Sequence, residues 1–168
     1  MDQKFTELQY TRPDMDSFRG ELEKAIDRLE KAETYAVARA VYFDLQDRET
    51  AVDTMATLAS IRNTIDTRDP FYDEEMKWIR KQNAQLIPLH KKWNMTLAKS
   101  PFRPDFIREF GEQMFRLIDA ALLVQDERLI EDTVRTGEIC QAYQKDSAMA
   151  QTDFRGEKCN FYGLLKHM

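Results

Sequence analysis

Apolar residues recur at three- and four-residue steps along most of the chain, which predicts helices rather than strands. The first stripe begins after Asp14, a suitable N-cap, and charged residues fill the positions between its members. Its apolar members are Met15, Phe18, Leu22, Ile26 and Leu29. We therefore expect an extended segment over residues 1–13 and an amphipathic helix over 14–33 that buries one side only.

A second helical pattern covers residues 34–65 and could continue unbroken for about 48 Å at 1.5 Å per residue. Because that length is unusual in a globular protein, we expect a bend or break near Asp47. One apolar stripe marks the first half: Val37, Val41 and Leu45. In the second half the apolar residues spread over more than one face, so we expect residues 52–65 to be buried on several sides and central in the fold.

Three further helices are expected, over residues 70–99, 104–123 and 126–149. Pro88 lacks an N–H group and should kink or divide the first of them. Gly111 interrupts the pattern of the second and indicates a corner there. The apolar positions expected to face inward in the third are Leu129, Ile130, Val134, Ile139, Cys140 and Tyr143.

The sequence pattern changes from helical to strand-like after residue 149. Two short runs flank Gly156 and predict a β-hairpin over about 150–161, which must pack on something because an isolated hairpin is marginally stable. Asn160 could cap a further helix, and the sequence ends in the middle of that pattern, so we expect it to be a fragment of a longer protein. The predicted fold is mainly α: one domain over 1–168, an array of long antiparallel helices with a small hairpin near the C-terminus.

A sharp turn is expected at residues 66–69, between two helices. Asp66 and Asp69 carry oxygens suited to capping, and Pro70 fits a first helical position, so these residues and Arg62 are our structural turn candidates. Arg62 has two interpretations. It could lock the turn through Asp66 or Asp69, the interpretation we favour, or it could anchor a substrate carboxylate.

Composition narrows the range of partners. The net charge is −5, and Lys and Arg alternate with Asp and Glu, which argues against nucleic acid as a partner. No apolar run approaches the ~18 residues of a membrane span, and the N-terminus lacks the apolar core of a signal peptide. Cys140 and Cys159 have no CxxC context, so we expect two free thiols and a cytoplasmic location.

The sequence contains few residues in patterns typical of a catalytic, metal or cofactor site. No glycine-rich phosphate loop is present, and neither His90 nor His167 has neighbours at the spacing of zinc ligands. Acidic pairs such as Glu74 and Glu75 are interpreted as solvated or helix-start charges. We therefore predict no catalytic residues and no metal ligands in this chain, and we assign no substrate-binding residue.

Three blocks of sequence indicate a family. They are YTRPDM at residues 10–15, TLASIRNTIDTRDPFYDEE at 57–75 and SPFR at 100–103. In order and spacing they resemble the N-terminal region of zinc-dependent oligopeptidases of the oligoendopeptidase F group, relatives of thimet oligopeptidase. The resemblance implies a zinc enzyme that cleaves short peptides in a deep channel, whose wall these helices would help to form. The family's His-Glu-x-x-His motif is absent here, so the catalytic zinc domain is expected beyond residue 168, and this chain alone is predicted to be inactive.

Two alternatives come from other classes of protein. A free-standing helical module could bind a partner protein through an apolar groove, without enzymatic activity. A helix array on a membrane surface is less well supported, because the polar faces carry mixed charge and are not enriched in Lys and Arg. An open reading frame after Met168 that contains His-Glu-x-x-His would decide for the peptidase, and a stop codon for the module.

Overall fold

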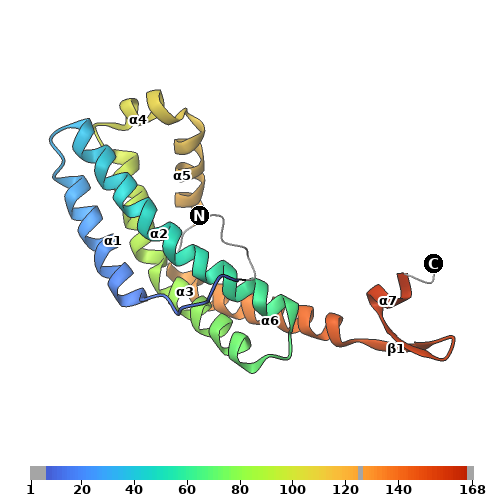
Figure 1. Ribbon diagram of the computed structural model, residues 1–168. Coiled ribbons are helices and arrows are strands. Elements are labelled where there is room, and N and C mark those ends of the chain that lie inside the picture. The colour runs from blue at the N-terminus through green and yellow to red at the C-terminus, as the bar shows by residue number, and fades with distance from the viewer. Residues whose placement is uncertain (1–6, 125–126, 166–168) are drawn as a thin grey trace.

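A computed structural model describes residues 7–124 and 127–165 of the protein (Figure 1). The elements are α1 (Met15–Glu30), α2 (Tyr35–Ile65), α3 (Pro70–Lys99), α4 (Arg103–Phe110), α5 (Gln113–Val124), a 3-10 turn (Glu127–Leu129), α6 (Ile130–Met149), β1 (Gln151–Phe154), β2 (Glu157–Asn160) and α7 (Phe161–Leu165). The predicted mainly α fold with a C-terminal hairpin is confirmed. Predictions that concern residues 1–6, Asp126 and His167 lie outside the described residues.

The bundle is built on α1, α2 and α3, which lie side by side in alternating directions (Figure 1). The Asp14 side chain accepts a hydrogen bond from the Ser17 N–H at 2.9 Å, which confirms the predicted N-cap of α1. The core forms where α1 packs on the first half of α2 and the second half of α3. Its most deeply buried members there are Leu22, Ile26, Ala38, Val41, Leu45, Leu86 and Leu97.

The two long helices are continuous, so neither is divided at the positions where a break was expected. α2 passes through Asp47 without a break, because that residue is exposed and no Gly or Pro lies between Tyr35 and Ile65. α3 likewise includes Pro88 and is not divided there. Buried residues on both sides of the proline, Leu86 and Trp93, belong to the same core and hold both halves of the helix on the bundle.

Burial in the second half of α2 is smaller than expected. Only Leu58 and Ala59 are buried there, whereas Ile61 is 38% and Ile65 is 70% exposed. The prediction that this half is central was wrong, because α1 covers the other half. Ile61 and Ile65 thus leave apolar surface exposed at the end of α2.

Gly111 forms the expected corner. Its φ of 85° ends α4, and its N–H donates to the Ile107 carbonyl at 2.9 Å. The turn brings Phe106 of α4 and Phe115 of α5 into the core, where both are almost fully buried. Rings of Tyr35, Tyr42 and Phe110 surround Phe106 at centroid distances of 5.1–6.1 Å.

The hairpin follows α6 and is confirmed. β1 and β2 pair antiparallel with Phe154 opposite Glu157, and Arg155 and Gly156 both have positive φ, as a two-residue type I′ turn requires. Cys159 is buried beside α7 and Cys140 is exposed, and both thiols are unpaired.

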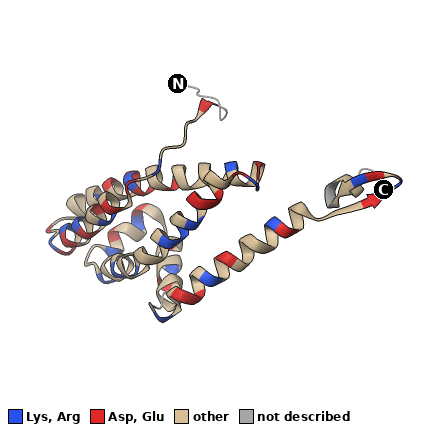
Figure 2. Cartoon of the chain, turned by 90° about the horizontal axis from the view of Figure 1, so that it is seen from below, with Lys and Arg blue, Asp and Glu red and all other residues tan. Residues whose placement is uncertain are grey.

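α6 differs most from its prediction. Of the six residues expected to face inward, Ile130 and Val134 are half-buried, whereas Leu129, Ile139, Cys140 and Tyr143 are exposed. The apolar stripe was taken as the side facing the bundle, but α6 turns a more polar side to α3. Figure 2 shows α6 and the hairpin extending away from the bundle as an arm.

Candidate functional site

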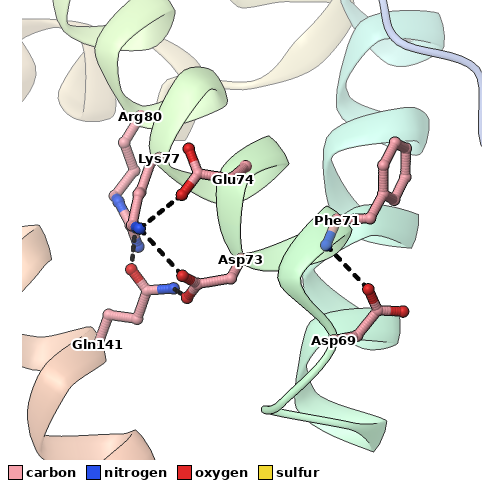
Figure 3. A network of polar contacts seen from close by, with 7 residues as sticks. All are labelled: Asp69, Phe71, Asp73, Glu74, Lys77, Arg80 and Gln141. Atoms are coloured by element: carbon pink, nitrogen blue, oxygen red, sulfur yellow. Dashed lines mark hydrogen bonds and ion pairs between the residues drawn. The ribbon is translucent and has the colours of Figure 1, made fainter.

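The sequence candidates lie together at the tip formed by the end of α2 and the start of α3. In the turn, the Asp69 N–H donates to the Asp66 carbonyl at 3.1 Å, and the Asp66 carboxylate accepts from the Arg68 N–H at 3.0 Å. The Asp69 side chain caps α3 by accepting from the Phe71 N–H at 2.9 Å (Figure 3), and Pro70 occupies the first turn of the helix. We call residues 61–75 the tip.

Arg62 lies in the last turn of α2, and its guanidinium donates to the backbone carbonyl of Leu8 at 3.3 Å. Through this bond it contacts a segment that precedes α1. The turn itself is closed by backbone groups, because the Asp66 N–H donates to the Arg62 carbonyl at 3.2 Å. Arg62 therefore links the tip to the N-terminal segment of the chain.

That segment, residues 8–13, crosses α2 and α3, and we call it the strap. Its Tyr10 hydroxyl and Arg12 guanidinium both donate to the carboxylate of Glu75, which is only 2% exposed. The Arg12 guanidinium also lies 4.7 Å from the centre of the Trp78 ring. The strap thus covers the half of the α2–α3 pair that α1 leaves open.

Burial is described for residues 7–124, 128–160 and 163–165. Among these, Glu75 is the one charged residue that is buried. Hydrogen bonds from Arg12 and, to a smaller extent, from Tyr10 lower the pKa of its carboxyl below the ordinary range, against the opposing effect of burial. Burial and the bond to Glu75 raise the pKa of Tyr10. Both shifts favour an ionised Glu75 that accepts hydrogen bonds from a neutral tyrosine and a charged arginine.

The lowered pKa of Glu75 predicts a pH dependence of stability. A carboxyl whose pKa is lower in the folded state stabilises the fold above its unfolded-state pKa, and this contribution is lost as the pH falls through the folded pKa. A Glu75→Gln variant should therefore be less stable than the wild type near neutral pH, and the difference should shrink below about pH 4. Urea denaturation at a series of pH values measures this difference, and a gap that stays constant with pH would contradict the assignment.

A second polar network joins α3 to α6 (Figure 3). The Gln141 amide donates to the Asp73 carboxylate at 3.0 Å, and its carbonyl oxygen accepts from the Arg80 guanidinium. Lys77 lies 3.0 Å from Asp73 and 2.8 Å from Glu74. Arg80 is partly buried, and this burial lowers its pKa. Polar groups therefore hold α6 on the bundle.

Gly137 allows α6 to approach α3 closely. A Cβ atom at this position would lie 3.0 Å from Cδ of Arg80, whereas one at Gly20, in the middle of α1, would meet nothing within 4 Å. Ala is favoured over Gly in a helix by about 1 kcal/mol. Gly20→Ala should raise the free energy of unfolding by about that amount, and Gly137→Ala should not, because Arg80 would be displaced. Chemical denaturation of the two variants tests this, and equal gains would contradict it.

A cleft of about 710 Å³ opens beside the second network, between the tip and the distal half of α6. Asn63, Thr64 and Thr67 line it from the tip, and Gln141, Gln144 and Ser147 line it from α6. Hydroxyl and amide groups thus face each other across it, and Tyr143 and Ala148 of α6 add apolar surface at its edge. Positions of Lys and Arg are interspersed with positions of Asp and Glu along the described helices (Figure 2).

No group of three or more His, Cys, Asp or Glu in the described chain could hold a metal ion. His90 lies on α3 with its Nδ1 3.9 Å from Glu49 of α2. The side chains present therefore do not fit a zinc site. In the same described part, none of the helices combines the length and the apolar character needed to cross a lipid bilayer.

Comparison with known proteins identifies the family. The family model of the peptidase M3 N-terminal domain matches residues 5–124, which is more than half of the chain. The chain belongs to the peptidase M3 family. The match includes the strap, the tip and α1–α5 and stops before α6. No curated protein matches this M3 chain.

Solved structures extend the likeness to α6 and the hairpin. An X-ray structure at 3.1 Å, described as that of a candidate oligoendopeptidase F, has a TM-score of 0.92 and 28% identity over 98% of this chain. A structure of PZ peptidase A with an inhibitor has a TM-score of 0.92 and 27% identity over 97%. A candidate oligoendopeptidase F from Bacillus anthracis, at 24% identity and a TM-score of 0.89 over 95%, supports the fold alone. This M3 chain spans 29% of the length of each.

Sequence reasoning missed the central residue of the strap contact. Glu75 was interpreted as a solvated or helix-start charge, and that interpretation was wrong, because the side chain is buried. A signal was present: Glu75 lies one turn before Ile79, on the buried stripe of α3. Tyr10 and Arg12 belonged to the first family block, but their partner lies 63–65 residues away in sequence, beyond the reach of local patterns.

Proposed function

We propose that this chain is the N-terminal helical part of a zinc metalloendopeptidase that hydrolyses short peptides, and that it forms part of the wall of the substrate channel. The observation that carries the proposal is the M3 family match together with the likeness to an oligoendopeptidase F candidate over 98% of the chain. PZ peptidase A, the second similar protein, was solved with an inhibitor bound. In this proposal the enzyme acts in the cytoplasm, in agreement with two unpaired thiols.

In this proposal, the bundle forms part of the channel wall and contributes no catalytic residue. The sequence lacks His-Glu-x-x-His, and its described side chains form no zinc site, so zinc and the residues that activate water would belong to chain outside these 168 residues. The tip, held by the strap and by Gln141, presents hydroxyl and amide groups toward a cleft. Such a rigid wall could restrict the channel to unfolded peptides.

Two polypeptides test the proposal. One is the 168-residue chain, and the other is the natural polypeptide that continues past Met168. With zinc and a quenched fluorescent peptide, the short chain should give no hydrolysis and the long one should cleave, with activity removed by a chelator and restored by zinc. Cleavage by the short chain would contradict the division of labour. A reading frame that ends at Met168 would favour the free-standing interaction module instead.

A further inference from the structure

The side of α6 that faces the bundle carries little apolar surface. Its half-buried positions follow a helical stripe: Ile130, Val134, Gly137, Gln141 and Lys145. No described side chain of α6 is buried, and beyond Val134 the helix contacts α3 through the close approach of Gly137 to Arg80 and the polar bonds of Gln141. α6 therefore meets the bundle mainly through polar groups and close backbone approach.

The opposite side of α6 is apolar and exposed. Ile139 is 59% exposed and Tyr143 is 72% exposed, and a separation of four residues places them on one face. At 3.6 residues per turn, Ile139 lies about halfway round the helix from the Gly137 and Gln141 side. Met149 at the end of α6 is 53% exposed. In a helix that packs on its own bundle alone, the apolar side faces the bundle and the polar side faces solvent. α6 shows the opposite arrangement.

Among the described residues, the structure beyond α6 has no extensive packing on the bundle. There β1 and β2 pair with each other and α7 packs on β2, and four-residue strands in a two-stranded sheet are marginally stable in water. Figure 2 shows the hairpin far from the helices of the bundle. We call α6, β1, β2 and α7, residues 130–165, the arm.

The solved structures match this chain over 95–98% of its length at TM-scores of 0.89–0.92, so the match extends into the arm, and in each case it covers 29% of a longer chain. An arm with so few internal contacts keeps one shape most readily when further contacts hold it. We propose that the arm is a docking element whose Ile139 and Tyr143 face packs on an apolar surface of the same polypeptide outside residues 1–168. This inference rests on the proposed function, since it takes the chain to be part of a longer peptidase.

Amide hydrogen exchange tests the contact. Backbone amides of β1, β2 and the distal half of α6 should exchange about tenfold or more slowly in the longer polypeptide than in the 168-residue chain. An Ile139→Asp, Tyr143→Asp double variant should lose this protection in the longer polypeptide. It should leave the 168-residue chain unchanged, because both side chains are exposed there. Val37→Asp is the matched control, since Val37 is also an exposed apolar residue, at 47%, in the first turn of α2.

The outcomes separate this inference from the proposed function. Equal exchange of the arm in both polypeptides would overturn the docking contact, even if the longer one hydrolyses peptides. Protection in the longer polypeptide without hydrolysis would uphold the contact and count against the peptidase. A 168-residue chain that sediments as a dimer with a protected arm would assign the face to a second copy and overturn the inference as stated.

Discussion

Replacement of Glu75 by alanine is expected to lower the free energy of unfolding by about 2–4 kcal/mol. The carboxylate accepts hydrogen bonds from both Tyr10 and Arg12, and its removal would take these hydrogen bonds between the strap and α3 away. For a chain of this size the midpoint of thermal unfolding should fall by roughly 5–15 °C. Thermal and urea denaturation followed by far-UV circular dichroism measure the loss.

The neighbouring residue provides the control. Glu74 pairs with Lys77 on the surface, and its side chain is 71% exposed, so Glu74→Ala should change stability by about 0.5 kcal/mol or less. The Glu75 variant should also admit protease to the strap at lower protease concentration than the Glu74 variant does. Equal effects of the two substitutions would show that the strap is not held by the buried carboxylate.

The sequence predicted the features that depend on neighbouring residues. Caps and turns at Asp14, Asp69 and Gly111 were read correctly, since each acts on a backbone group within four residues of itself. The hairpin was located for the same reason, with Gly156 at a position of positive φ. Features of this kind need no knowledge of the rest of the fold.

Predictions failed where a distant partner decides the outcome. Asp47 and Pro88 looked like interruptions, but α2 contains no Gly or Pro, and packing on both sides of Pro88 keeps α3 continuous. Ile139 and Tyr143 looked like core residues because an apolar stripe usually faces the bundle, and here the bundle meets the polar stripe that contains Gln141. An apolar stripe indicates which side of a helix tends to be covered, but it does not identify the surface that covers it.

Phe106→Ala should produce the largest loss of stability, about 3–5 kcal/mol. The ring is fully buried, and its centroid lies within 6.5 Å of the ring centroids of four aromatic residues: Tyr35, Tyr42, Phe110 and Phe115. Truncation therefore leaves a cavity that α4 and α5 cannot easily fill. Phe106→Leu should lose less, about 1–2 kcal/mol. Leu123→Ala, at a side chain that is 87% exposed, should change stability by about 0.5 kcal/mol or less.

Combining Phe106→Ala with Glu75→Ala tests whether the bundle has one stabilising region or two. Figure 1 places α4 at the opposite end of α3 from the tip, and Phe106 packs in the aromatic cluster whereas Glu75 binds the strap. If each acts on its own region, their effects on the free energy of unfolding should add within about 0.5 kcal/mol. A larger discrepancy would mean that the strap stabilises the aromatic cluster through α3, and the bundle would then respond as one body to a change at either end.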